Sequence, residues 1–230
     1  MVLFAMSEKF SDRILVNHSD TLHSDELSAL HDLDDFLANY DDVLSSKPRS
    51  DRAKIFTKNT HVLSIHLSNL SLTSLPESFS TFSFLDRLDL SYNNFSSFPK
   101  VVSQLPSLSD LNFSFNLLES FPIIAFRLAN LYRLTLANNQ FAHFPDPLCS
   151  FHKLRILDFS FNLLTVLPDC VGEMGHLRSF NLANNNLISI PLAMTKLTKL
   201  RMLDLSNNIE LSEWSQLYEG MQVQEFFNKW

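Results

Sequence analysis

Residues 154–164, LRILDFSFNLL, contain the pattern that decides the fold of this 230-residue chain. Apolar residues occupy the first, fourth, sixth and eleventh positions of this block, and Asn162 occupies the ninth. A fixed period of this length predicts a solenoid, because one unit cannot bury its apolar face alone and must stack on its neighbours. The block begins at seven positions that are each 23 residues apart: Val62, Leu85, Leu108, Leu131, Leu154, Leu177 and Leu200.

The first half of each block predicts a short strand with one buried side. Apolar residues follow the opening position three and five residues later, as Leu134 and Leu136 follow Leu131. This alternation is typical of a strand that turns every second side chain inward. An asparagine comes next in six blocks, and its amide can pair with backbone groups that a turn leaves free. Stacked blocks therefore predict a ladder of Asn93, Asn116, Asn139, Asn162, Asn185 and Asn208.

The second half of each block predicts a short helical turn on the opposite side. A leucine–proline or phenylalanine–proline pair, such as Leu167–Pro168, is followed by two apolar residues three apart, here Val171 and Met174. Proline suits a segment that makes no ladder hydrogen bonds, and the spacing favours 3₁₀ or α-helical turns. Most of the 21 phenylalanines fall at inward positions, which predicts a phenylalanine spine in the core.

These residues resemble the leucine-rich repeat family over positions 62–211. The 23-residue period is most similar to intracellular members of the Ras-suppressor, Scribble/Erbin and plant Ras-group type. The resemblance implies an α/β solenoid: a curved array with a parallel concave β-sheet, short 3₁₀ or helical convex segments and an N-terminal helical cap. The end repeats depart from the pattern, with Leu70 in place of the asparagine and Glu213–Trp214 in place of the leucine–proline pair.

The flanks form two further predicted units, residues 1–61 and 212–230, the second being an aromatic-rich C-terminal cap. Apolar residues at steps of three and four predict a helix over 24–45, with Ser24 as its N-cap. That segment holds seven acidic residues and no basic ones. It is interpreted either as a cap over the first repeat or as an acidic docking segment for a basic partner.

The remaining N-terminal residues give weaker signals. Residues 46–60 are interpreted as a polar connection into the array, and residues 1–20 have no clear pattern. The chain stops abruptly at Trp230, so a longer parent protein is an open alternative.

The two cysteines bear on the cellular compartment. Cys149 and Cys170 lie in the predicted convex segments of successive repeats, and neither flank contains a cysteine. We expect two unpaired thiols, as in a reducing compartment. No run approaches the roughly 20 apolar residues of a membrane span, and residues 2–6 are too short for a signal-peptide core. The expected location is cytoplasmic.

Catalytic motifs are missing from the sequence. The chain contains only three glycines, and they form no glycine-rich phosphate loop. Its eight histidines show none of the spacings that are typical of zinc sites. Cys149 and His152 lie three apart but have no third orienting group, so a structural interpretation is favoured. The net charge of −7 disfavours nucleic acid as a partner, although a local basic strip stays open. We expect no enzyme, cofactor or metal.

The concave face carries the candidate partner-binding residues. Arginine and exposed aromatic side chains are typical of interface anchors, and we expect Tyr132, Arg133, Arg155 and Phe161 to form one patch. Similar residues are common in the family consensus, so an evenly decorated scaffold is the alternative. The full candidate set is Arg87, Asp89, Tyr92, Asn112, Phe115, Tyr132, Arg133, Arg155, Asp158, Phe161, Arg178, Asn181, Arg201 and Asp204.

The sequence therefore favours a non-catalytic module that binds a protein on its concave face. The resemblance suggests a small GTPase or a signalling enzyme as partner. Two alternatives stay open: a targeting or regulatory segment of a larger enzyme, such as a metal-dependent protein phosphatase or an adenylyl cyclase, and an effector directed at host signalling. Neither the partner nor the oligomeric state follows from the sequence.

Overall fold

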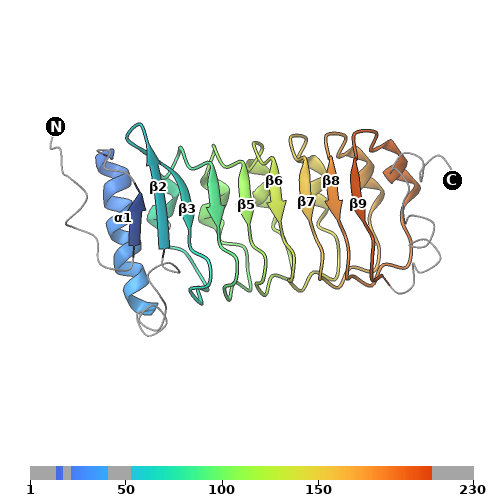
Figure 1. The fold of residues 1–230 in the computed structure, drawn as a ribbon, viewed down its shortest axis with the longest axis horizontal. Coiled ribbons are helices and arrows are strands. Elements are labelled where there is room, and N and C mark those ends of the chain that lie inside the picture. The colour runs from blue at the N-terminus through green and yellow to red at the C-terminus, as the bar shows by residue number, and fades with distance from the viewer. Residues whose placement is uncertain (1–13, 18–21, 41–52, 209–230) are drawn as a thin grey trace.

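A computed structural model describes residues 14–17, 22–40 and 53–208. One nine-stranded sheet, in the order β1 to β9, runs the length of the solenoid, and short 3₁₀ helices lie behind it (Figure 1). The strands are β1 (Ile14–Asn17), β2 (Ala53–Lys58), β3 (His61–His66), β4 (Arg87–Asp89), β5 (Asp110–Asn112), β6 (Arg133–Thr135), β7 (Ile156–Asp158), β8 (Ser179–Asn181) and β9 (Met202–Asp204).

From β3 to β9 the strands are parallel and in register, so that each residue pairs with the residue 23 positions later. Leu88, Leu111 and Leu134 are one such row, and each is at most 1% exposed. The row is buried because its side chains fill the core that one repeat cannot close alone. The predicted solenoid with a parallel sheet is confirmed.

The convex side consists of 3₁₀ helices of five residues each, as the spacing of apolar residues predicted. Each helix follows a proline at its N-cap, where the fixed φ of proline suits an extended residue that leads into the turn. The helices are η4 (Glu77–Thr81), η5 (Lys100–Gln104), η6 (Ile123–Arg127), η7 (Asp146–Ser150), η8 (Asp169–Glu173) and η9 (Leu192–Lys196).

Phenylalanine rings fill the space between the sheet and these helices. Phe95 and Phe113 meet edge to face with centroids 5.6 Å apart, and Phe141 and Phe159 do so at 4.9 Å. These geometries are favourable for aromatic pairs. The predicted phenylalanine spine is confirmed by the fully buried Phe79, Phe82, Phe95, Phe113, Phe141, Phe159 and Phe180.

The asparagine ladder joins each repeat to the one before it. The Asn93 amide donates to the Leu67 carbonyl oxygen at 2.7 Å, and its Oδ1 accepts from the Leu70 and Leu72 N–H groups. Asparagine thus serves the turn of the preceding repeat. Position 70 has no preceding repeat to serve, because β2 runs antiparallel to β3, and Leu70 is instead buried in the core.

Two strands at the N-terminal end were not expected from the sequence. β2 lies inside the predicted polar connection 46–60 and forms a hairpin with β3, and β1 lies inside the patternless segment 1–20 and pairs in parallel with β2. The interpretation of β2 as a connection was wrong because its period-two pattern is hidden among lysine and threonine. Ala53 and Ile55 are fully buried, whereas Lys58 is exposed.

The predicted N-terminal helix is present as α1 (Ser24–Leu37), followed by η2 (Ala38–Tyr40). Leu30, Leu33 and Leu37 are fully buried in the core, and α1 packs beside η4. The N-cap is His23 rather than Ser24, since the His23 carbonyl oxygen already accepts from the Leu27 N–H at 2.9 Å.

Two parts of the flank predictions lie outside the described residues. These are positions 41–45 of the predicted helix and the predicted C-terminal cap over 212–230. Within the described segments, no helix combines the length and the apolar character needed to cross a bilayer.

The cysteine prediction was wrong, because Cys149 and Cys170 form a disulfide. Cys149 lies in η7 and Cys170 in η8, and their Cα atoms are 5.7 Å apart. Stacking places the convex segments of neighbouring repeats side by side, so that residues 21 apart in sequence become neighbours. The prediction of a reducing compartment depended on unpaired thiols, and the disulfide removes that support.

Candidate partner-binding face

The sheet presents three rows of side chains away from the core, and each row runs across the strands. We name them from their place along each strand. The entry row lies just before β4 to β9 and, in the first repeat, inside β3; it is Leu63, Asp86, Ser109, Tyr132, Arg155, Arg178 and Arg201. The central row is Ser64, Arg87, Asp110, Arg133, Ile156, Ser179 and Met202. The exit row is His66, Asp89, Asn112, Thr135, Asp158, Asn181 and Asp204.

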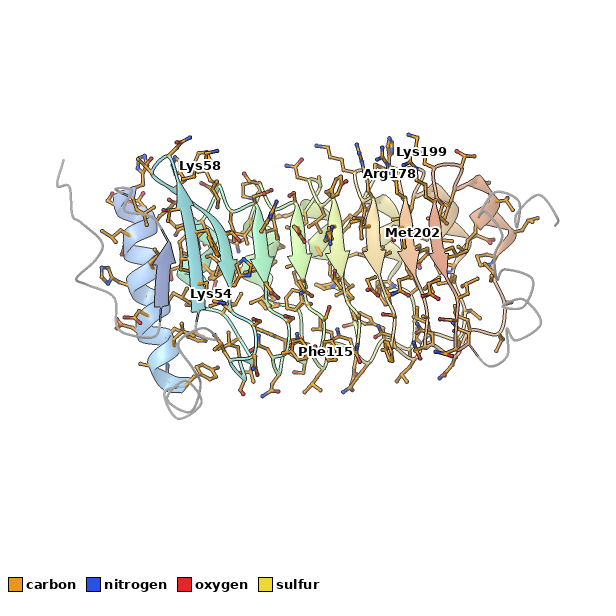
Figure 2. The ribbon with its side chains drawn as sticks, in the orientation of Figure 1. Lys54, Lys58, Phe115, Arg178, Lys199 and Met202 are labelled. Atoms are coloured by element: carbon orange, nitrogen blue, oxygen red, sulfur yellow. A yellow bond between two sulfur atoms is a disulfide. The ribbon has the colours of Figure 1, made fainter. Side chains whose placement is uncertain are left out.

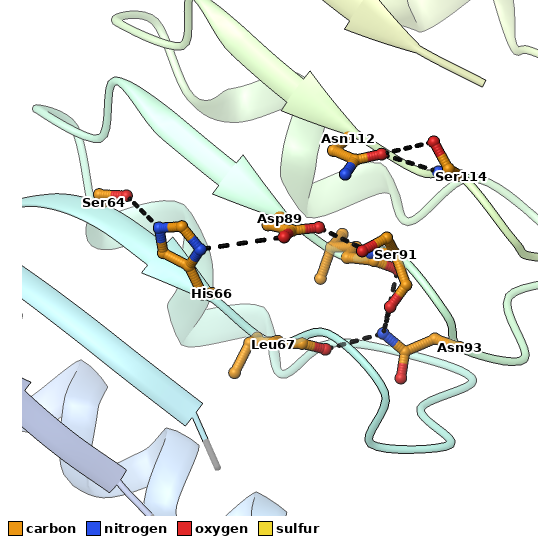
Figure 3. A network of polar contacts seen from close by, with 9 residues as sticks. Ser64, His66, Leu67, Asp89, Ser91, Asn93, Asn112 and Ser114 are labelled. Carbon is orange, nitrogen blue, oxygen red and sulfur yellow. Dashed lines mark hydrogen bonds and ion pairs between the residues drawn. The ribbon is translucent and has the colours of Figure 1, made fainter. Parts of the chain in front are cut away.

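The exit row has a local structural role that the sequence did not reveal. Asp158 Oδ1 accepts from the Ser160 N–H at 3.0 Å and from its hydroxyl at 2.7 Å. Such side-chain-to-backbone bonds stabilise the turn that ends each strand. The same acceptor role falls to Asp89, Asn112, Asn181 and Asp204. Figure 3 shows the bonds of Asp89 to Ser91 and of Asn112 to Ser114. In each of these five candidates, one side-chain oxygen is already hydrogen-bonded within the fold. Only the other polar atom of the side chain is available to a partner.

Ser64, His66 and Asp89 form a polar chain at the N-terminal end of the face (Figure 3). The Ser64 hydroxyl lies 3.0 Å from His66 Nε2, but His66 Nδ1 lies 3.8 Å from Asp89 Oδ2. The second distance exceeds the hydrogen-bond range of about 2.7–3.2 Å. A serine, a histidine and an aspartate in this sequence of contacts are also found in nucleophilic triads. In a triad the aspartate orients the histidine through a hydrogen bond, and the described His66 and Asp89 side chains do not make that bond.

Asp110 lies among charges of both signs in the central row. Arg133 Nε lies 3.8 Å from Asp110 Oδ2, and Arg87 Nε lies 3.6 Å from Asp86 Oδ2. Burial raises the pKa of Asp110, while Arg133 and Arg87 act to lower it and the neighbouring Asp86 and Asp89 to raise it. Asp110 was not among the sequence candidates. The signal for it was its place between two arginines in register.

The predicted patch of four residues is divided by the structure. Arg155 lies over the Tyr132 ring, with its guanidinium carbon 5.2 Å from the ring centroid, and Arg133 adjoins this pair. Phe161 lies six residues beyond Arg155, past the other end of β7, which corresponds to about 15–20 Å along a strand. Figure 2 shows Phe115 and Arg178, which occupy the corresponding positions of other repeats, at opposite ends of the strands.

Phe161 instead belongs to an aromatic ledge at the strand exits, which consists of Tyr92, Phe115, Leu117, Phe161 and Leu163, each 41–53% exposed. The Tyr92 and Phe115 rings stack with centroids 4.0 Å apart. Leu117 and Leu163 were not among the sequence candidates, because the position directly after the asparagine is not fixed by the repeat pattern.

The aromatic residues of this ledge have a backbone conformation that is unusual for bulky side chains. Tyr92, Phe115 and Phe161 have positive φ of 54–58°, and asparagine holds the equivalent Asn138 and Asn184 positions. A bulky residue in the left-handed region costs about 1–2 kcal/mol relative to its usual conformation. Stacking offsets part of this cost for Tyr92 and Phe115, since such pairs contribute about 0.5–1.5 kcal/mol.

The entry row becomes basic toward the C-terminal end of the array. Arg178 and Arg201 are exposed, as is Lys199 beside them (Figure 2). Among the residues with described side chains, no carboxylate lies within ion-pair distance of these three cations. They are therefore open to a ligand from outside the described chain.

Comparison with known families matches this architecture. The model described as "Leucine rich repeat" matches residues 129–187 and 152–209, and a second model, "Leucine Rich Repeat", matches residues 84–105. No curated protein sequence matches the chain significantly.

Solved structures give the same result. A leucine-rich repeat protein of Leptospira interrogans is 29% identical over 68% of this chain, with a TM-score of 0.63, and 42% of that protein is covered. The ectodomain of the Arabidopsis receptor kinase HAESA is 25% identical over 78% of this chain, with a TM-score of 0.65 and 32% of its own length covered.

A third neighbour is the ectodomain of the receptor kinase GASSHO1/SCHENGEN3 from Arabidopsis thaliana. It is 31% identical over 61% of this chain, with a TM-score of 0.55 and 18% of its length covered. The chain thus spans less than half the length of each of these three neighbours. The repeats, the ladder, the family models and the structural neighbours agree, and the chain belongs to the leucine-rich repeat family.

Proposed function

We propose that this chain is a non-catalytic module that binds a protein or peptide partner on its concave face. The observation that carries the proposal is the open face of β3 to β9 (Figure 1). Its central row exposes large side chains such as Arg87, Arg133 and Met202, which are not required by the core. Arginine and other large side chains of this kind are enriched at interfaces.

Size and the structural neighbours also support the proposal. Seven parallel strands at about 4.8 Å give a face roughly 30 Å wide, which suits a standard interface of about 800 Å² on each partner. Two structural neighbours are in complex with a ligand: HAESA with an IDA peptide hormone, and GASSHO1/SCHENGEN3 with CASPARIAN STRIP INTEGRITY FACTOR 2.

The partner class depends on the compartment. The 23-residue period resembles that of intracellular Ras-suppressor-type repeats and favours a small GTPase or another signalling protein. The disulfide between Cys149 and Cys170 favours an oxidising compartment, where such bonds persist, and there a secreted or surface peptide replaces the cytosolic partner. The redox state of these two cysteines in the native protein tests the compartment, on which the choice between the two classes depends.

The test is affinity capture with three forms of the full chain: wild type, Arg133→Glu/Arg155→Glu, and a convex control, Arg127→Glu/Lys196→Glu. The control cations are exposed in η6 and η9, and its charge change equals that of the face variant. Proteins that bind the concave face are retained by wild type and control and lost with the face variant, because reversed charges repel a complementary partner.

Folding of each variant is checked by circular dichroism and thermal unfolding, since the carboxylate introduced by Arg133→Glu would lie near Asp110. Exposed substitutions usually change stability by about ±0.5 kcal/mol or less, so the fold should persist. Binding that survives the face variant but disappears with the convex control would place the docking surface on the other side.

A further inference from the structure

Five cations gather where β7, β8 and β9 begin, and we call this set the basic edge: Lys153, Arg155, Arg178, Lys199 and Arg201. They are five of the 18 lysines and arginines in a chain whose formal charge is −7. The equivalent positions of the two repeats that begin at Leu85 and Leu108 hold no cation: Phe84, Asp86, Ser107 and Ser109. The positive charge is therefore concentrated at one end of an otherwise neutral or acidic edge.

The basic edge is partly held in place and partly free. Arg155 lies over the Tyr132 ring, and Lys153 Nζ donates to Asn130 Oδ1 at 2.6 Å. Arg178, Lys199 and Arg201 are exposed, and the described residues give them no ion pair (Figure 2). Within the described residues, an anion can therefore reach these three cations without first breaking an ion pair.

The spacing of the arginines suits a short extended peptide. Neighbouring strands are about 4.8 Å apart, so Arg155, Arg178 and Arg201 span roughly 10 Å. Side chains on one face of an extended peptide repeat about every 7 Å, so two carboxylates of one segment fall within the span of the three arginines. Arginine pairs with carboxylates through two parallel hydrogen bonds, which adds geometric specificity.

The neighbouring rows limit what else the ligand can be. Ile156 and the 66% exposed Met202 lie next to the basic edge in the central row, and Asp158 and Asp204 follow in the exit row, about 10 Å from the arginines. A long phosphate polymer would meet these carboxylates and the net negative charge of the chain. A peptide that continues from acidic into apolar residues meets apolar side chains instead.

We propose that the basic edge binds a short, extended acidic peptide segment. Its carboxylates pair with Arg155, Arg178 and Arg201, and an adjoining apolar side chain packs on Ile156 and Met202. The inference rests on the proposed function and deepens it, because it names the chemistry of the protein or peptide that docks at the C-terminal half of the face.

The test uses fluorescence anisotropy with the full chain and defined probes. The probes are a labelled peptide EEELEELEEE, its glutamine counterpart QQQLQQLQQQ, a ten-residue oligoglutamate and a ten-nucleotide oligothymidylate. The edge variant is Arg178→Glu/Arg201→Glu. The matched control is Lys58→Glu/Lys100→Glu, which makes the same charge change at exposed cations of the N-terminal half that lie outside the candidate set.

We expect the acidic leucine-containing peptide to bind wild type and control alike, and to bind the edge variant at least about tenfold more weakly. The glutamine peptide should not bind, oligoglutamate should bind more weakly, and added salt should weaken every complex. The proposal is overturned if the acidic peptide does not bind saturably, if oligothymidylate binds as tightly, or if the control loses as much affinity as the edge variant. If oligoglutamate binds as tightly as the leucine-containing peptide, the proposed apolar contact with Ile156 and Met202 is ruled out.

These outcomes are separate from those of the concave-face test, which changes Arg133 and Arg155 and measures capture of natural partners. If the face variant loses capture of natural partners but the acidic peptide does not bind, the proposed concave-face function stands and only the acidic ligand is ruled out. If the acidic peptide binds but the face variant captures the same proteins as wild type, docking of a natural partner on the concave face is ruled out instead.

Discussion

The side chain of Asn139 donates a hydrogen bond to the carbonyl oxygen of Phe113, 26 residues earlier, at 2.9 Å. Its Oδ1 accepts from the Leu118 N–H at 2.9 Å, so a single buried amide serves two backbone groups of the preceding repeat. Parallel strands alone would leave these turn groups unpaired. Stability of the array therefore depends on side chains that act across repeat boundaries.

Replacing Asn139 with alanine should destabilise the protein by about 1–3 kcal/mol, because it leaves buried backbone groups without partners. Equilibrium urea denaturation measures the change. Asn186→Ala is the control, since Asn186 is exposed, and it should stay within about ±0.5 kcal/mol. An Asn139→Ala protein as stable as wild type would show that water replaces the amide.

Protein purified without reductant should contain the Cys149–Cys170 bond. Alkylation followed by mass spectrometry should label neither cysteine before reduction and both after it. Because the bond links η7 to η8, Cys149→Ser/Cys170→Ser should lower the stability by up to about 2–4 kcal/mol. Two labelled thiols in unreduced protein would restore the expectation of a reducing compartment.

Glu26 should make stability depend on pH at the N-terminal end. Its Oε2 accepts from the Val62 N–H at 3.2 Å and lies 3.4 Å from His61 Nδ1, and burial raises the pKa of this carboxyl above its ordinary value of 4.5. The hydrogen bond from Val62 and the histidines His61 and His23 oppose that rise without cancelling it. The folded state thus holds the proton to a higher pH than the unfolded chain.

The contribution of Glu26 to stability is consequently complete below pH 4.5 and is lost as the pH rises through the raised pKa. Glu26→Gln is neutral at every pH, so its stability relative to wild type should increase as the pH is raised above 4.5. Urea denaturation of both proteins across that range measures the difference. A relative stability that falls with pH would mean that ionised Glu26 is favoured by the histidines.

Removing residues 1–45 tests whether the acidic helix is a cap. Leu30, Leu33 and Leu37 of α1 are fully buried, so deletion should expose the apolar end of the array and cause aggregation or loss of the cooperative transition. Light scattering and thermal unfolding measure these effects. A soluble truncation of equal stability would favour the alternative, a docking segment for a basic partner.

Particular residues show how far the sequence reached. The opening leucines and the six asparagines could be placed because their offsets repeat and their burial follows from period-two alternation. Asp158 and Asn181 were assigned only to partner binding, although each also caps its own turn. That role depends on a hydrogen bond to the residue two positions later, which residue type alone does not reveal. Which outward residues a partner contacts stays a prediction.

The sequence by itself determined the solenoid, the strand register and the buried phenylalanine spine, because a 23-residue repeat of apolar positions has one way to bury them all. Only the tertiary structure decided which surface residues meet. Stacking paired Cys149 with Cys170 across two convex helices, while the length of the strands separated Phe161 from Arg155. Distances between repeats are set by the packing of strands, and sequence spacing does not measure them.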